Sequence, residues 1–396
     1  MALERRALIG MCVLIAVNQL GFGGIVPALP LYAQSFGVSA SAIGLAIAVY
    51  GLARFVVAVP SGQLSDRIGR RPTLAIGGLV SAIGNLGCAL AGSYPEFIAA
   101  RFVAGLGAGL VLTTGQVVLA DITTPERRAR TIAIYQGTFI FSVGIGPYPG
   151  GLLAEHLGLA APFTAYAAAG SAAAIVAWLA IPETREHGRG ALGHGALPAF
   201  SRQIALLRRQ IGFMLVGLIA LMNAVVRTGG LFSIIPVLAS TRMGLSVDTI
   251  GLGLAAGSVA GLGATYPAGM LADRYGRKAV IVPATVLSGA SMLLFGLAAG
   301  EALYLTACLI WGVATAVGGS APAAYAADSA PPGMNAAAMS TFRMLGDIGY
   351  VLGPLALGAI VDWQGPETAL ASGAAGLVLA GVAFARFAAE THRRSG

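Results

Sequence analysis

Five charged side chains lie inside long apolar runs of this chain: Arg54, Arg101, Arg227, Arg343 and Asp347. Placing an ionised group at the centre of a membrane costs at least about 2.5–3.5 kcal/mol, so such a residue normally faces a cavity or a partner. Arg101 lies near the end of its run, and its long side chain offers a second solution, which is to reach the membrane surface. These residue types predict anion binding and proton transfer.

Asp347 is the carboxylate nearest the middle of an apolar run, and we expect it to carry protons. Burial favours the protonated form of such a group, whereas a nearby arginine favours the ionised form. Arg343 lies one helical turn earlier on the same face. An Arg343–Asp347 or Arg54–Asp347 ion pair that only locks helices together is the alternative.

Uncharged polar residues accompany these charges in the predicted substrate cavity. The predicted cavity set is Asn18, Gln19, Arg54, Asn223, Arg227 and Asp347. Three or four arginines against one aspartate would make the cavity net positive, which favours anionic or neutral polar solutes.

The elements that position these residues are membrane-spanning helices. The chain has 396 residues, of which 57% are hydrophobic and 10% charged, whereas soluble domains carry about 25% charged residues. Apolar runs long enough to cross a bilayer predict spans near 7–33, 42–64, 72–93, 96–120, 131–154, 162–181, 211–238, 248–270, 279–299, 303–326, 337–361 and 366–388. The predicted fold is an all-α membrane protein whose two six-helix halves, 1–181 and 211–396, are joined by a cytoplasmic linker at 182–210.

Basic residues gather in alternate loops, and Arg242 is the one basic residue of the opposite loops. By the positive-inside rule both termini are cytoplasmic. This topology accounts for the net charge of +8, so no nucleic-acid partner is expected. Membrane lipids are the expected surroundings.

Other functional classes lack their motifs. Cys12, Cys88 and Cys308 show no CxxC spacing, and no histidines cluster, so neither a disulfide nor a metal site is expected. No HExxH, GxSxG or GxxxxGK motif occurs. We therefore expect no enzyme and no cofactor.

An internal repeat relates the halves without gaps at an offset of 207 residues. It pairs Pro60 with Pro267, Gly62 with Gly269, Asp66 with Asp273, Arg70 with Arg277, Asp121 with Asp328, and Pro147 with Pro354. Two halves of the same orientation imply a pseudo-twofold axis along the membrane normal. Residues shared by both halves serve the architecture, and residues of one half alone are better candidates for function.

Residues 62–71, GQLSDRIGRR, are echoed at 269–278 and resemble the loop motif between helices 2 and 3 of the major facilitator superfamily. The resemblance, specifically to its twelve-span drug:proton antiporters, covers nearly the whole chain. It implies that Asp66 faces the N-terminus of helix 11, where a helix dipole stabilises negative charge, and that Asp66, Arg67, Arg70 and Asp121 latch the cytoplasmic side. The full gating set is Gly62, Asp66, Arg67, Gly69, Arg70, Arg71, Asp121, Asp273, Arg274, Gly276 and Arg277.

Two further motifs carry the resemblance. Residues 101–109, RFVAGLGAG, resemble the family's helix 4 motif, which implies that Arg101 takes part in proton coupling together with Arg343 and Asp347. Gly146, Pro147, Gly150 and Gly151 resemble the GPxxGG core of exporters on helix 5, although Ser142 stands where a preceding glycine is expected. This helix is predicted to bend at the proline and to pack closely at its glycines.

The resemblance implies a monomeric multidrug-efflux type of transporter in a bacterial inner membrane. We expect export of small amphiphilic or anionic solutes, drug-like compounds or metabolites, by proton antiport with rocker-switch alternating access. A proton symporter or a uniporter for a sugar or organic acid is the alternative. Helix 1 carries Asn18 and Gln19 but no acid, which argues against cationic drugs.

Overall fold

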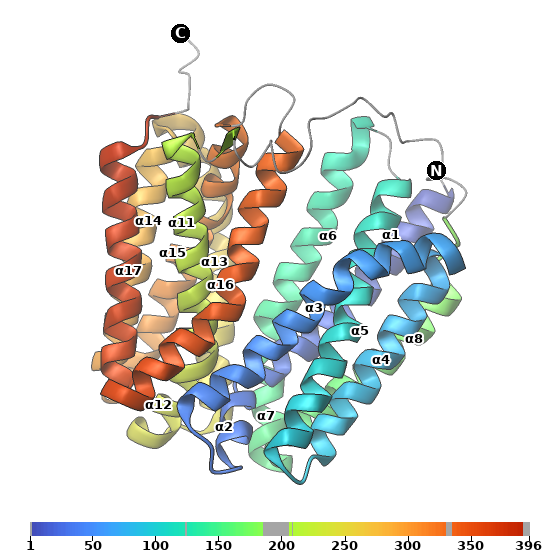
Figure 1. Cartoon of the computed structure of the whole chain (residues 1–396), viewed down its shortest axis with the longest axis horizontal. Helices are drawn as coiled ribbons and strands as arrows, with labels where there is room; N and C mark the ends of the chain where they lie inside the picture. Colours follow the sequence, from blue (N-terminus) through green and yellow to red (C-terminus); the bar gives the residue numbers. More distant parts are fainter. Residues whose placement is uncertain (1, 123–124, 185–205, 208, 330–334, 391–396) are drawn as a thin grey trace. The chain divides into compact units, whose positions relative to one another are not determined.

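The computed structural model describes residues 2–122, 125–184, 206–207, 209–329 and 335–390. Within these ranges the chain is helical apart from short connections (Figure 1). It divides into two compact units. Unit 1 comprises Met1–Val38, Leu45–Gly193 and Ser246–Ala255, and unit 2 comprises Ser39–Gly44, His194–Leu245 and Ala256–Gly396.

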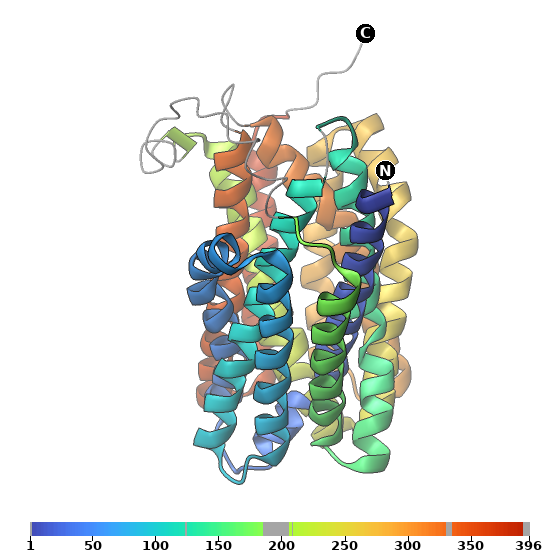
Figure 2. The same cartoon turned by 90° about the vertical axis from the view of Figure 1, so that its right-hand side faces the viewer.

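Unit 1 is built mainly on the helices of the first half. These are α1 (Ala2–Ile25), α2 (Leu29–Gln34), α3 (Ala40–Ile68), α4 (Arg70–Leu90), α5 (Tyr94–Ile122), α6 (Pro125–Ile145), α7 (Pro147–Leu157) and α8 (Ala161–Ala180). Helix α4 packs against α5 and α8, and α8 also packs against α1, as Figure 2 shows for the green α8 and the dark blue α1. Small residues permit this packing: a Cβ at Gly84 would lie 2.2 Å from the Ala104 backbone nitrogen.

Unit 2 is built mainly on the helices of the second half. These are α11 (Ile211–Val225), the π-helix η1 (Val226–Ile234), α12 (Ile235–Met243), α13 (Val247–Tyr275), α14 (Arg277–Leu297), α15 (Glu301–Asp328), α16 (Asn335–Gln364) and α17 (Pro366–Phe387). Helix α14 packs against α15 and α17, and α11 packs against α16. The predicted seventh span is thus three consecutive helical segments, α11, η1 and α12.

Eleven helical stretches of the described residues are long and apolar enough to cross a membrane. The predicted fifth span differs from them because α6 ends at Ile145 and α7 begins at Pro147. Gly146 between them keeps helical φ and ψ angles of −52° and −39°, so the backbone stays helical across the interruption. Pro147 has no N–H to continue the helical ladder. The count of twelve spans stays a prediction.

The first predicted span also ends earlier than expected. Helix α1 stops at Ile25, and Leu29–Gln34 forms the separate short helix α2 with a proline in its first turn. Of the predicted linker, residues 185–205 and 208 lie outside the described residues.

Candidate functional site

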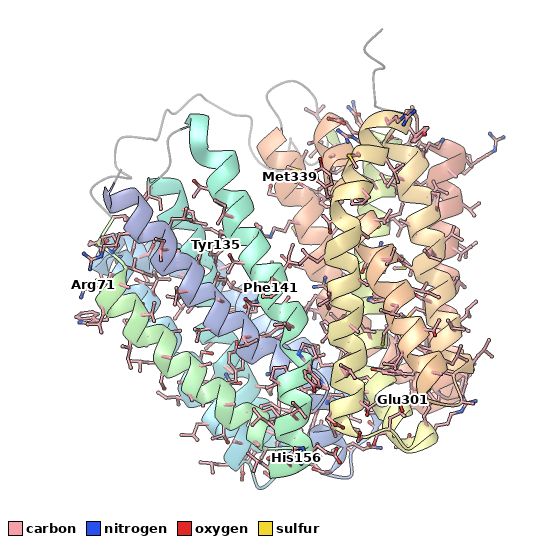
Figure 3. The ribbon with its side chains drawn as sticks, turned by 180° about the vertical axis from the view of Figure 1, so that it is seen from behind. Arg71, Tyr135, Phe141, His156, Glu301 and Met339 are labelled. Atoms are coloured by element: carbon pink, nitrogen blue, oxygen red, sulfur yellow. The ribbon has the colours of Figure 1, made fainter. Side chains whose placement is uncertain are left out.

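The loop motif forms an ion-pair cluster around Arg70, at the end of unit 1 where Figure 3 labels Arg71. The Arg70 side chain is 7% exposed, and its Nε donates to Asp121 Oδ2 at 3.0 Å. Its Nη1 donates to Asp66, whose side chain is 69% exposed. Thr184 Oγ1 also donates to Asp121, at 3.0 Å. Arg70, Asp66 and Asp121 therefore meet, and Asp121 is the buried acid of the cluster.

Glu183 also belongs to this cluster, and the sequence analysis missed it. Its carboxylate accepts hydrogen bonds from the backbone N–H groups of Arg70 (2.9 Å) and Arg71 (3.2 Å), which begin α4. Gly69, just before them, has a φ of 106°, a backbone region that favours glycine. A carboxylate on these N–H groups satisfies donors that the helix leaves open and complements the helix dipole.

Unit 2 repeats this arrangement. Glu390 accepts hydrogen bonds from the backbone N–H groups of Arg277 (3.1 Å) and Lys278 (3.0 Å), after Gly276 with a φ of 102°. Arg277 Nε lies 3.6 Å from Asp328 Oδ2. Glu183 and Glu390 are 207 residues apart and each precedes a threonine, so the repeat offset is the signal that would have found them.

The remaining gating residues take other positions. The Arg71 guanidinium lies 4.7 Å from the Trp178 ring centroid, and that of Arg274 lies 5.3 Å from the Tyr275 ring. Arg67 is exposed in the last turn of α3. The side chain of Asp273 lies outside the described part of the structure. The predicted contact of Asp66 with the N-terminus of the eleventh predicted span, which is α16 in the structure, stays a prediction. Residues 330–334, which precede α16, also lie outside the described part of the structure.

Arg101 lies inside unit 1 rather than at its surface, with 1% of its area exposed. Its Nε donates to the Ala46 carbonyl oxygen at 3.1 Å, and its guanidinium carbon lies 4.4 Å from the Tyr50 ring centroid. The Tyr50 and Tyr166 hydroxyls are 3.3 Å apart. Arg101 Nη1 is buried and has no hydrogen-bond partner among the described residues. The charge is thus held by a carbonyl and an aromatic face.

The helix 1 amides are also buried in unit 1. Asn18 is fully buried and Gln19 is 4% exposed. Neither side-chain atom of Asn18 has a hydrogen-bond partner among the described residues. A buried amide without partners costs about 1–3 kcal/mol, so Asn18 is suited to a water molecule or a polar solute. Arg54 is half-buried on α3 and lies close enough to act electrostatically on Tyr50.

In unit 2, the polar residues of the predicted seventh span lie at and before the π-helix. Arg227 is exposed, with its guanidinium carbon 5.8 Å from the Phe232 ring centroid. Asn223 Nδ2 donates to the Ile219 carbonyl at 3.0 Å. Thr228 Oγ1 donates to the Tyr350 carbonyl of α16 at 3.2 Å. Because π-helical turns often occur at functional sites, η1 strengthens the case for Arg227.

Asp347 lies on a face of α16 that does not pack on α11. Gly349 and Gly353 of α16 mark the packed face, since a Cβ at either would lie 2.5 Å from a backbone oxygen, of Leu221 and Val225 respectively. Two residues correspond to about 200° around a helix, so Asp347 points nearly opposite Gly349. Asp347 and Arg343 are both exposed.

The GPxxGG residues pack closely within unit 1. A Cβ at Gly150 would lie 1.9 Å from the Gly24 carbonyl oxygen of α1, and one at Gly151 would lie 2.5 Å from the Val247 carbonyl oxygen. These glycines therefore allow backbone-to-backbone contact.

Comparison with known proteins agrees with this architecture. The family model described as Major Facilitator Superfamily matches residues 11–247 and 216–396. The chain belongs to the major facilitator superfamily. It is 32% identical to the inner membrane transport protein YajR of Escherichia coli (strain K12) over 234 residues, which is 58% of this chain and 51% of YajR.

Two other similarities concern export and fold. The chain is 30% identical over 158 residues to citrate exporter 1 of Aspergillus niger, covering 40% of this chain and 30% of that protein. The matched stretches thus span about half of these relatives or less. The structure of a bacterial homologue of the human lysosomal transporter Spinster aligns with a TM-score of 0.78 at 16% identity, covering 97% of this chain and 96% of the other. Family and structural neighbours are transporters, and nothing indicates catalytic activity.

Proposed function

We propose that this superfamily transporter exports small amphiphilic or anionic solutes, drug-like compounds or metabolites, in exchange for protons. The two halves would alternate access in a rocker-switch cycle, in a bacterial inner membrane and with both termini in the cytoplasm. One proton entering through 100 mV releases about 2.3 kcal/mol, which exceeds the roughly 1.4 kcal/mol of a tenfold solute gradient. Proton flow is therefore sufficient for export.

The exposed carboxylate of Asp347 is the observation that supports the proposed coupling of export to proton movement. The other acids in the eleven described spans, Glu96, Asp248, Glu301, Asp328, Asp362 and Glu367, all lie within about one turn of a span end. Asp347 lies well inside its span, on the face of α16 turned away from α11. Acidic side chains inside membrane spans form the proton relays of pumps and transporters.

The solute class follows from the charges. The spans of unit 1 hold Arg101 well inside Tyr94–Leu119 and Arg54 about one turn from the end of Ala40–Ala58, and no carboxylate lies in their middle. The guanidinium of Arg101 has a buried nitrogen without a partner in the described structure, and Asn18 adds an unpartnered amide. A positive interior attracts anions or neutral polar groups. The similarity to the citrate exporter of Aspergillus niger agrees with an anionic solute.

The test uses the purified transporter in liposomes that contain a pH-sensitive dye. After a pH gradient is imposed, anionic, neutral and cationic solutes are added to the wild type and to Asp347→Asn. We expect protons to move in the direction opposite to the solute, and the effect to be largest with anionic solutes. The Asp347→Asn variant should lose this proton movement. Glu301→Gln is the matched control, since Glu301 is an exposed acid at the start of α15, and it should leave the exchange unchanged.

Other outcomes would decide against the proposal. Protons moving in the same direction as the solute would show symport. Solute movement that depends neither on the pH gradient nor on the Asp347→Asn substitution would show a uniporter. Preference for lipophilic cations would overturn the assigned solute class.

A further inference from the structure

Two arginines contact the last turn of α8, at the end of unit 1 where Figure 3 labels Arg71. The Arg71 guanidinium carbon lies 4.7 Å from the centroid of the Trp178 ring, and Arg6 Nη2 donates to the Leu179 carbonyl oxygen at 3.3 Å. Arg6 belongs to α1 and Arg71 to α4, the two helices that pack on α8 within unit 1. We call these four residues the α8 arginine site.

The site lies where three predicted spans end. Arg6 begins one span, Arg71 follows the first residue of another, and Trp178 is two residues from the end of a third. Trp178 is 52% exposed and Leu179 66% exposed, so both are open to the surroundings of the helices. Tryptophan rings favour the membrane–water interface, and arginine side chains reach it from the ends of spans. We therefore place the site at the level of the lipid headgroups.

Both guanidiniums retain hydrogen-bond donors. An arginine side chain carries five N–H donors, and the described contact of Arg6 uses one nitrogen. Arg71 Nε has no hydrogen-bond partner among the described residues. The neighbouring acid, Glu183, accepts from the backbone N–H groups of Arg70 and Arg71. Among the described residues neither Arg6 nor Arg71 forms an ion pair, so the site carries two positive charges.

The second half of the chain does not repeat this site. The offset of 207 residues replaces Arg6 by Phe213, Arg71 by Lys278 and Trp178 by Ala385. A lysine cannot hold a phosphate through two parallel hydrogen bonds as an arginine does. Since residues shared by both halves serve the architecture, a basic and aromatic site in one half alone is a candidate for binding.

We propose that the α8 arginine site binds the phosphodiester headgroup of an anionic phospholipid. Each guanidinium can donate two parallel hydrogen bonds to phosphate oxygens, and basic pockets between membrane helices bind the headgroups of anionic lipids. Trp178 and Leu179 supply exposed apolar area for the glycerol and the upper acyl chains. An anionic lipid is favoured over a zwitterionic one, because no ammonium group of its own offsets the phosphate. The lipid bridges α1 and α4 across the end of α8.

The test uses the fluorescence of Trp178 in reconstituted protein. The other two tryptophans, Trp311 and Trp363, are replaced by phenylalanine, so that Trp178 is the reporter. The vesicles mix phosphatidylcholine with phosphatidylglycerol, and one lipid at a time carries brominated acyl chains, which quench a tryptophan that they contact. The ratio of quenching by the two lipids gives their relative affinity beside Trp178. The measurement needs no transport, so its outcome is independent of the proposed antiport.

We expect phosphatidylglycerol to be preferred at Trp178. Arg6→Gln and Arg71→Gln should each lower this preference about fivefold, since a basic residue near anionic lipid contributes about 1 kcal/mol and 1.4 kcal/mol is a factor of ten. The double variant should bind both lipids equally. Arg71→Lys keeps the charge without the paired hydrogen bonds and should lose less than Arg71→Gln. Arg6 is exposed, so Arg6→Gln tests the site without altering the loop motif.

Two controls separate a built site from the general attraction of a basic surface. Arg386, the counterpart of Leu179 under the repeat, is an exposed arginine in the last turn of α17, and Arg386→Gln should leave the preference at Trp178 unchanged. A chain whose sole tryptophan is Trp363 reports on the last turn of α16, where Trp363 is 81% exposed beside Asp362. This reporter should show no preference for phosphatidylglycerol.

Three results would decide against the site. Equal quenching of Trp178 by both lipids would overturn it, and so would a preference that the double variant retains. The third concerns the source of the phosphodiester. An excess of glycerophosphoglycerol, the headgroup without acyl chains, should leave the preference in place. Its loss would mean that the site takes soluble phosphodiesters, and the assignment to lipid would be wrong.

Discussion

Two arginines of this chain show different solutions to burying a charge. Arg70 is paired with two carboxylates, one buried and one exposed. Arg101 is more deeply buried, yet its described contacts are a carbonyl oxygen and the Tyr50 ring. A paired charge is fixed in place, whereas one with an open donor can accept an anion or a water molecule. We therefore assign a structural role to Arg70 and a solute- or proton-linked role to Arg101.

At the residue scale, we predict that Asp121→Asn destabilises the protein more than Asp66→Asn. Asp121 is 7% exposed and accepts from both Arg70 and Thr184, whereas the Asp66 side chain is 69% exposed. Losing a buried charged hydrogen bond costs about 1.5–3 kcal/mol, and an exposed ion pair contributes at most about 1 kcal/mol. Thermal unfolding in detergent would compare the two. Equal losses of stability would contradict the assignment of Asp121 as the central acid.

A second residue-scale prediction concerns the Tyr50 ring. Tyr50→Leu removes the aromatic face over Arg101 and should lower stability by about 0.5–2 kcal/mol beyond the packing loss. Tyr50→Phe keeps the ring and loses only the hydroxyl near Tyr166, so it should be milder. Thermal unfolding in detergent would compare the stabilities of the two Tyr50 variants. A Phe variant as unstable as the Leu variant would mean that the hydroxyl contact, and not the ring, holds the site.

At the element scale, carboxylates from other segments of the chain cap the N-termini of four long helices. Glu183 and Glu390 cap α4 and α14 at one end of the units, and Asp362 and Glu155 cap α3 and α13 at the other. None of these four acids comes from the helix that it caps, so the caps define tertiary contacts as well as helix starts. Each helix start is consequently coupled to the position of its neighbour.

The Glu183 cap can be tested within one molecule. Glu183→Ala leaves the first N–H groups of α4 without their acceptor, and a lost cap costs about 0.5–2 kcal/mol. Hydrogen exchange of the first turn of α4 should therefore accelerate by about fivefold, since each 1.4 kcal/mol is a factor of ten. The first turn of α14, which Glu390 caps, is the internal control and should not change. Acceleration of both turns would indicate general loosening.

At the scale of the whole molecule, the repeat gives both halves the same contacts. The α3 and α13 helices each begin in one unit and continue in the other, so the two units are joined through helices as well as through the linker. The loop motifs lie at the C-terminal ends of these same two helices, opposite the ends that Asp362 and Glu155 cap.

The membrane orientation, with both termini in the cytoplasm, is a prediction of its own. A fluorescent protein fused after Gly396 should fluoresce, because the positive-inside rule places the C-terminus in the cytoplasm. Alkaline phosphatase inserted at Gly158, in the turn between α7 and α8, should be active, since it would lie outside. The reverse pattern would contradict the proposed orientation.

The sequence by itself determined the membrane helices, the repeat and the superfamily. Hydropathy is a local property, and the offset of 207 residues needs no structure to be seen. It also brought Asp66, Arg70 and Asp121 together as candidates. What it did not show was that Glu183, Glu155 and Asp362 cap helices, because their donors are backbone N–H groups, which carry no residue signature.

Only the tertiary structure decided how each polar group is satisfied. It buried Arg101 against Tyr50, left Asn18 without a described partner, and turned Asp347 away from α11. These outcomes depend on which helices meet and at what angle, and the side-chain spacing of one helix does not contain that information. A charge inside a membrane was predictable from composition, but the group that faces it was a matter of packing.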